Sequence, residues 1–370
     1  MLKDRAQKAT ALKFCVSKRW LPQLEVEIEP SNRLERSKFL LTDLDVLCIT
    51  TSPVGMHSKV VFDCKSGTRE SAIGRAFWLR GVMTKVGADH GFVVLNSKLK
   101  LSRDHRISAS ELGVSLLHDS EFADLAQGLQ GSIKLQSDYS LVSDIEAWEA
   151  FLELRSKSPA LAEYMSYSAS AFWTIKDYGE QCRKTIARLR KLRPELDPSK
   201  TDHLAIFGDA LCLFLISLSS LANKLFLLLM RPSAAEDFSS ALLASVYGGY
   251  ESLQSAIKIR QLATGQTDES VSIFPDIERF EQLVREIVQA PQQALPAALL
   301  SREIGFTHLK GAADTRLQMD IAIESPYAPK FILLAAEYLQ RAAKLPPEFS
   351  AIYVEHMLSL MSRATYKKSV

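Results

Sequence analysis

The residues of this chain whose types and spacing could do chemistry stand on two neighbouring apolar segments of the stretch 40–67. Asp45 lies in the first segment, and Asp63 and Lys65 lie in the second. Side chains of a β-strand alternate between its faces, so an antiparallel pairing would bring Asp45 near Asp63 and Lys65. Two carboxylates, with the backbone carbonyl of Cys64, could hold a hard cation such as Mg²⁺. The lysine could then orient or help deprotonate a metal-bound water, or stabilise charge in the transition state of phosphodiester hydrolysis.

Asp45, a spacer of 17 residues and the triplet Asp63-Cys64-Lys65 resemble the signature of the PD-(D/E)XK nuclease superfamily. The resemblance covers roughly residues 2–124 and implies a restriction-endonuclease-like fold, with a mixed sheet flanked by helices. It also implies that Asp45 and Asp63 bind Mg²⁺, for which Mn²⁺ can substitute, and that Lys65 is the catalytic lysine. The expected activity is endonucleolytic cleavage of nucleic acid, DNA rather than RNA, in restriction or antiviral defence.

Two positions depart from the pattern of this superfamily. Leu44 rather than proline precedes Asp45, and the segment 2–19, which we expect to form the first helix, contains no glutamate. Glu25 or Glu27 could complete the metal site in place of that glutamate. Both lie on the first predicted strand, where an acidic side chain could equally well face water.

An Asp-x-Lys triplet also occurs by chance in many sequences. If that is the case here, the acids of the strand that contains Asp45 form only the solvated face of an edge strand. The surrounding sequence favours the nuclease interpretation, because the triplet ends an apolar strand and a helix is expected at 67–87. Ser66 or Thr68 could cap this helix, with Glu70 in its first turn.

Composition sets limits on the class of protein. The chain has 370 residues, more than one hydrophobic core usually serves, so we expect two or three domains. With 47% hydrophobic residues, 24% charged residues and a net charge of +2, it is typical of a soluble globular protein, and any affinity for nucleic acid must come from a local patch. Five scattered cysteines without a CxxC pair, and no secretory signal, indicate a reduced cytoplasmic protein without a zinc site.

The periodicity changes along the chain from strand-like to helical. We therefore predict a nuclease-like α/β domain at 1–125, a linker at 126–140 and an all-α domain at 141–370 that binds substrate or a partner. The first domain should contain strands at 20–29, 91–95 and 114–117 and a short helix at 107–112, besides the elements already named. The helices expected in the second domain are 143–155, 159–193, 203–230, 234–263, 274–289, 326–344 and 348–363.

The segment 182–193 carries six basic residues and no acid. Clustered positive charge on a helix can bind phosphates, so we expect this helix to line the same groove as Asp63 and to hold the nucleic-acid backbone there. Two arginines of the first domain could do the same, and for all of them the alternative is a solvated face. The candidate phosphate-binding residues are Arg69, Arg75, Arg183, Lys184, Arg188, Arg190, Lys191 and Arg193.

The segment 210–230 is long and apolar enough to span a bilayer. Asn223 and Lys224 lie inside it, and a charge at membrane depth is costly. We therefore expect a buried helix of a bundle and no membrane association. The alternative to a nuclease is a catalytically inactive scaffold or binding subunit that keeps the nuclease fold and acts through its helical domain.

Overall fold

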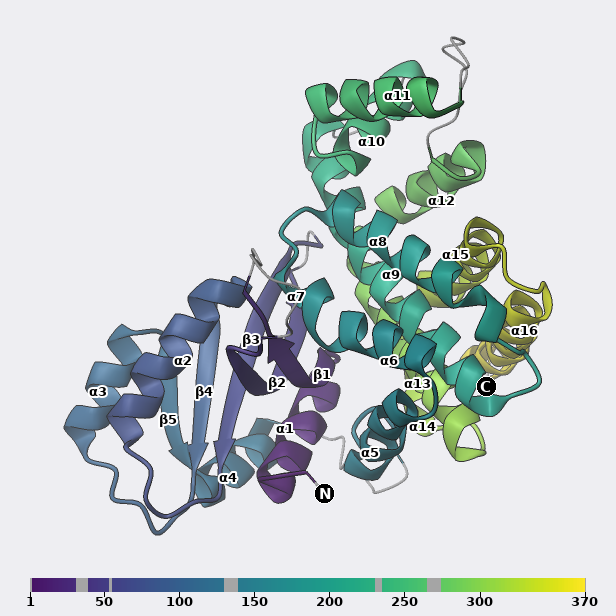
Figure 1. Cartoon of the computed structure of the whole chain (residues 1–370). Coiled ribbons are helices and arrows are strands. Elements are labelled where there is room, and N and C mark those ends of the chain that lie inside the picture. Colours follow the sequence, from purple (N-terminus) through teal and green to yellow (C-terminus); the bar gives the residue numbers. More distant parts are fainter. Residues whose placement is uncertain are drawn as a thin grey trace. The chain divides into compact units, whose positions relative to one another are not determined.

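The computed structural model describes residues 2–30, 39–52, 55–129, 139–229, 235–264 and 274–369. The charged segment 32–38 and most of the predicted linker lie outside these residues. The chain divides into two compact units (Figure 1). The first unit comprises Met1–Ser52, His57–Thr174 and Ala312–Leu317, and the second comprises Pro53–Met56, Ile175–Gly311 and Gln318–Val370.

The first unit is an α/β structure built on one five-stranded sheet. Its strands are β1 (Leu21–Ile28), β2 (Thr42–Thr51), β3 (His57–Lys65), β4 (His90–Leu95) and β5 (Val114–His118). The strand order follows the chain. β1, β2 and β3 pair antiparallel, whereas β3, β4 and β5 pair parallel. The sheet is therefore mixed, as expected.

Helices cover both faces of this sheet (Figure 1). They are α1 (Arg5–Ser17), α2 (Ala72–Val86), α3 (Arg103–Glu111) and α4 (Asp119–Leu129). On one face, Phe14 of α1 and Phe122 of α4 pack on Phe62 and Phe92 of the central strands, with ring centroids 5.0–6.4 Å apart. On the other face, α2 lies so close to β4 that a Cβ at Gly91 would meet the side chain of Leu79 at 2.8 Å.

The helix α2 begins later than the sequence indicated. Its N-cap is Ser71, whose hydroxyl accepts from the Gly74 amide at 3.2 Å, so the prediction that Ser66 or Thr68 caps it was wrong. Ser66 is engaged elsewhere, because its amide and hydroxyl both donate to Asp4. The helix ends as expected at Gly87, which has a φ of 66°.

The division between the units differs from the predicted linker at 126–140. The segment 139–174 belongs to the first unit and forms α5 (Ile145–Glu153), a 3₁₀ turn (Leu154–Ser156), α6 (Pro159–Ser166), a π-helical turn (Tyr167–Ala171) and α7 (Phe172–Thr174). Salt bridges attach it to the sheet and to α1, since Arg155 pairs with Glu27 and Arg5 pairs with Glu149. Charged contacts of this kind leave no hydrophobic periodicity in the sequence, so the sequence could not show that this segment belongs to the first unit.

The second unit is helical. Its α-helices are α8 (Tyr178–Leu192), α9 (Thr201–Leu229), α10 (Ala235–Val246), α11 (Tyr250–Thr264), α12 (Ile277–Gln289), α13 (Ala294–Lys310), α14 (Arg316–Glu324), α15 (Tyr327–Ala343) and α16 (Glu348–Ser369). The expected helix 159–193 is broken, because Lys176 and the cap Asp177 interrupt it before α8. The expected helix 234–263 is broken at Gly248 and Gly249, which both have positive φ. The sequence also failed to predict α13 and α14.

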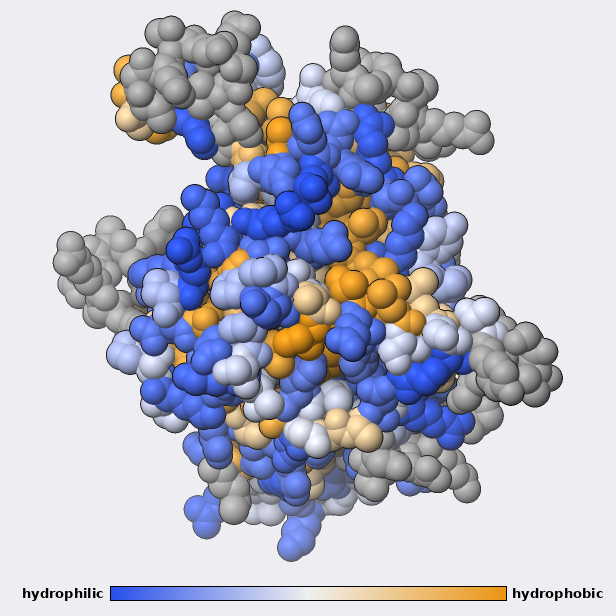
Figure 2. Space-filling model, turned by 90° about the vertical axis from the view of Figure 1, so that its right-hand side faces the viewer, coloured by the Kyte–Doolittle hydropathy of each residue, from blue (hydrophilic) through white to orange (hydrophobic). Residues whose placement is uncertain are grey.

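The helix α9 is long and apolar enough to cross a membrane, and its apolar window is wholly buried within the structure. It crosses α13 at two glycines, where a Cβ at Gly208 would lie 2.9 Å from the Cα of Gly305. A buried ion pair joins the same helices, with Arg302 and Asp209 2.7 Å apart and both side chains at 0% exposure. Figure 2 shows one face of the molecule, where hydrophilic residues cover most of the surface and hydrophobic residues gather near the middle.

Candidate active site

The antiparallel pairing of β2 with β3 brings the two predicted aspartates together. Val46 pairs with Phe62, so continuing the register places Asp45 opposite Asp63, on the same face of the sheet. Both carboxylates are buried, with 5% and 1% of the residue exposed. Burial of two carboxylates this close requires positive charge beside them.

Lys65 supplies part of that charge. Its Nζ lies 3.0 Å from Asp45 Oδ2 and 2.9 Å from Asp63 Oδ1. The same Nζ donates to the backbone carbonyl of Cys64 at 3.0 Å. The three oxygen atoms predicted to bind a cation therefore surround one ammonium group. The Cys64 amide donates to Asp45 Oδ2 at 2.6 Å and fixes this carboxylate against β3.

Arg75 forms a fork on the second aspartate. Its Nε donates to Asp63 Oδ2 at 2.7 Å and its Nη2 to Asp63 Oδ1 at 2.5 Å. The guanidinium group also lies over the ring of Trp78, 4.0 Å from the centroid. The structure therefore gives Arg75 a carboxylate partner where the sequence suggested a phosphate. Arg69 is exposed in the segment that precedes α2.

Lys8 of α1 neutralises the other side of the cluster. Only 2% of its side chain is exposed, and its Nζ lies 2.9 Å from Asp45 Oδ1 and also pairs with Glu25. Glu25 interrupts the β1–β2 ladder opposite Asp45 and has a φ of 54°, a strained conformation for a residue with a side chain. Of the two glutamates proposed to complete the site, Glu25 is thus connected to Asp45 through Lys8. Glu27 pairs instead with Arg155.

Sequence reasoning missed the part that α1 has in this site. Asp4 accepts from Ser66 at 2.7 Å, and Gln7 donates to the Lys65 carbonyl at 3.3 Å, so both hold the end of β3. A detectable signal was present. Positions 4, 7 and 8 continue, at helical spacing, the buried stripe that includes Ala11, Leu12 and Cys15. Polar residues that continue a buried stripe must find polar partners.

The charges of this cluster balance, with three acids (Glu25, Asp45 and Asp63) and three bases (Lys8, Lys65 and Arg75). Burial works against the protonated form of Lys65, but the carboxylates of Asp63 and Asp45 outweigh it and raise its pKa above the usual value. Burial also works against the protonated form of Lys8, but the carboxylates of Asp45 and Glu25 outweigh it and raise the pKa of Lys8. Burial raises the pKa of Glu25, and Lys8 only partly offsets this effect.

The donor set fits a divalent cation. Asp45, Asp63 and the Cys64 carbonyl are oxygen ligands of the kind that Mg²⁺ prefers, and they already converge on a positively charged group. In the part of the chain that the structure describes, no three His, Cys, Asp or Glu side chains could hold a metal ion together. A cation here would use two carboxylates, the carbonyl and water, after Lys65 and Arg75 had moved aside.

The basic segment of α8 belongs to the second unit, and part of its charge has structural partners. Arg183 donates to the Val246 carbonyl at 3.0 Å and Arg190 to the Ala342 carbonyl at 3.1 Å, at the ends of α10 and α15, where cations are favourable. Lys184 pairs with Glu180 on its own helix. Phosphate binding by this helix stays a prediction.

Compared with known proteins, the chain matches no family model, no curated protein and no solved structure. The functional assignment therefore depends on the motif and on the geometry described above.

Proposed function

We propose that the first unit is a Mg²⁺-dependent endonuclease that hydrolyses the phosphodiester bonds of nucleic acid, DNA in preference to RNA. The observation that carries this proposal is the convergence of Asp45, Asp63 and the Cys64 carbonyl on Lys65 Nζ, at 2.9–3.0 Å. Two carboxylates, a carbonyl oxygen and a lysine at one point are the groups that metal-assisted hydrolysis needs.

Asp45, Asp63 and the Cys64 carbonyl would hold the cation, which when bound supplies Lewis-acid stabilisation and activates a water. Lys65 has a raised pKa and therefore stays protonated at neutral pH. Beside a bound cation, Lys65 would stabilise developing negative charge on the phosphate or orient a metal-bound water. Gln7 and the Cys64 amide keep the strand end and Asp45 in position.

Cleavage of plasmid DNA in Mg²⁺ tests the proposal. Asp63→Asn and Lys65→Met should each lower the cleavage rate by about 10²-fold or more, because the first removes a charged ligand of the cation and the second removes a positive charge that stabilises the transition state. Asp43→Asn is the matched control, since Asp43 is an exposed acid on the same strand as Asp45. Circular dichroism should show that all three variants fold. Full activity in Asp63→Asn and Lys65→Met would refute the assignment.

A second function is favoured by one observation. Every acid of the cluster already has a basic partner, and the Arg75 fork occupies both oxygens of Asp63. Such a network is what an inactive scaffold that keeps the fold would also use. Purified protein that binds neither Mg²⁺ nor Mn²⁺ and cuts no nucleic acid would support the scaffold, which would then bind its partner through the helical second unit.

A further inference from the structure

Positive charge gathers in the part of the chain that follows the candidate active site. Residues 65–106 carry nine basic and three acidic side chains, a net charge of +6, whereas the whole chain carries only +2. This stretch comprises the end of β3, the helix α2, the strand β4, the start of α3 and the loops between them. A surface with this excess of positive charge attracts a polyanion.

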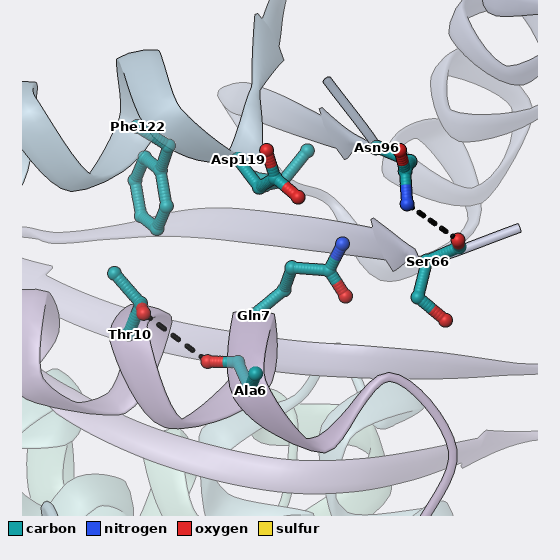
Figure 3. A pocket seen from close by; sticks show the side chains of 8 residues that line it. Ala6, Gln7, Thr10, Ser66, Asn96, Asp119 and Phe122 are labelled. Carbon is teal, nitrogen blue, oxygen red and sulfur yellow. Dashed lines mark hydrogen bonds between the residues drawn. The ribbon is translucent and has the colours of Figure 1, made fainter. Parts of the chain in front are cut away.

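Two loops of this stretch, 66–71 after β3 and 96–102 after β4, lie side by side. Because β3 and β4 are parallel neighbours, both loops leave the same edge of the sheet. Asn96 joins them, since its Nδ2 donates to the Ser66 carbonyl at 2.9 Å (Figure 3). The carboxyl ends of parallel strands are where open α/β sheets bind ligands. Both loops therefore begin beside Lys65, the last residue of β3.

The cations at this edge of the sheet are exposed. They are Arg69 in the first loop, Lys98 and Lys100 in the second, and Arg103 at the start of α3. Among the residues that the structure describes, no acid forms a salt bridge with any of these four, whereas the three bases of the active-site cluster all pair with carboxylates. A strand of nucleic acid would neutralise several such cations at once with successive phosphates.

The exposed face of α2 adds an aromatic ring to these charges. Phe77 is 61% exposed, whereas Leu79 and Met83 of the same helix are buried. Gly74 and Gly81 lie three residues before it and four residues after it, and therefore on the same face of the helix. A Cβ at Gly81 would meet nothing within 4 Å, so packing among the described residues does not require glycine there.

Glycine within a helix is unfavourable for stability, but it lets a ligand approach the backbone closely. A planar base could stack on Phe77, with the two glycines leaving room on either side of the ring. Phe77 lies six residues after the N-cap Ser71, about 9 Å along the helix, a distance that a few nucleotides span. The structure describes α2 completely, and Phe77 is its one exposed large apolar side chain, which suits a stacked base better than a membrane surface.

We propose that the two loops, Arg103 and Phe77 together hold a single-stranded segment of nucleic acid, with its phosphates on the cations and an unpaired base stacked on Phe77. The proposal rests on the proposed nuclease function, because it names the form of nucleic acid that reaches Lys65. A duplex keeps its bases stacked on one another and would use only the cations, whereas single strands are bound by cationic grooves and aromatic stacking together.

Binding of fluorescently labelled DNA in EDTA tests this surface apart from catalysis. The protein should bind oligo(dT) of about 20 nucleotides more tightly than a blunt duplex of the same length. Phe77→Ala should weaken oligo(dT) binding by about 5- to 100-fold, the loss expected for one stacked base, and leave duplex binding unchanged. Ile107→Ala is the matched control, because Ile107 is 59% exposed in the same unit but has no ring to stack.

The salt dependence of oligo(dT) binding tests the cations. Replacing Lys98, Lys100 and Arg103 with glutamine should reduce the slope of log K against log salt concentration by about 2, at roughly 0.7 per phosphate contact of a single strand. The matched control replaces Lys3 and Lys13, which are exposed cations of the same unit, and should leave the slope unchanged.

Cleavage in Mg²⁺ gives a second readout. Circular single-stranded DNA should be cut faster than supercoiled plasmid, and Phe77→Ala should remove most of this difference. If DNA is cut but the Phe77 and triple variants bind it like the wild type, the surface is overturned and the nuclease stands. If binding falls in these variants but no DNA is cut, the nuclease is overturned and the surface stands. Binding to phosphatidylserine vesicles without binding to either DNA, or no binding to any of them, would also overturn the surface.

Discussion

Arg75 tests how the buried carboxylates of the candidate active site are neutralised. Replacing it with glutamine removes a positive charge from an aspartate whose side chain is 0% exposed, while the side chain of Arg75 itself is 20% exposed. Breaking a buried ion pair costs about 3–5 kcal/mol. Lys65 still neutralises Asp63 at 2.9 Å, so we expect a cost at or below the bottom of that range, about 2–3 kcal/mol. For a unit of this size the melting temperature should fall by roughly 4–12 °C.

The same substitution should strengthen metal binding. Arg75 occupies both oxygens of Asp63 and repels a divalent cation, so Arg75→Gln should tighten Mg²⁺ or Mn²⁺ binding by at least about tenfold, or ~1.4 kcal/mol. Thermal unfolding in metal-free buffer and in increasing Mg²⁺ measures both effects, because a ligand of the native state raises the melting temperature. Arg80→Gln, an exposed arginine on the same helix, is the control. If Arg75→Gln melted at the wild-type temperature without metal, the ion pair would be refuted. If Mg²⁺ raised the melting temperature of Arg75→Gln no more than that of the wild type, the metal site would be refuted.

Two further predictions concern stability. Gly208→Ala should lower the free energy of unfolding by about 1–3 kcal/mol, because its Cβ would meet the Tyr353 hydroxyl at 2.3 Å and the backbone of α13 at 2.9 Å. Gly81→Ala, with open space around it, should instead stabilise α2 by about 0.5–1 kcal/mol. Equal changes in the free energy of unfolding, measured by chemical denaturation, would contradict this difference in packing. Lys8 has a raised pKa, so its stabilising contribution is complete below the ordinary lysine pKa of about 10.4 and is lost as the pH rises through its higher folded value. Between about pH 10 and 12 the free energy of unfolding of Lys8→Met should therefore fall less than that of the wild type. Parallel plots of unfolding free energy against pH for the two proteins would contradict this prediction.

The sequence predicted the sheet and the proximity of Asp45, Asp63 and Lys65 because both depend on local patterns. Alternation in β2 and β3 was enough to place Asp45 beside Asp63 and Lys65. It could not show which cations would balance them, because Lys8 and Arg75 come from helices on either side of the motif, and their side-chain directions depend on packing.

The same limit explains the errors elsewhere. α13 is buried on almost every side, so it has no polar face and no periodicity to reveal it. Pro291 and Pro296 around its start also resemble a loop in sequence. The start of α2 was placed too early because Ser66, Thr68 and Ser71 are all suitable N-caps, and the sequence does not show that Ser66 bonds instead with Asp4.

A crystal structure of the protein soaked with Mn²⁺ tests the central claim most directly. We expect one anomalous peak between Asp45 of β2 and Asp63 of β3, with both carboxylates and the Cys64 carbonyl within about 2.0–2.6 Å of it and with Lys65 Nζ displaced from its present position. A map in which Lys65 and Arg75 keep their bonds to Asp63 at saturating Mn²⁺, with no peak between the two aspartates, would contradict it.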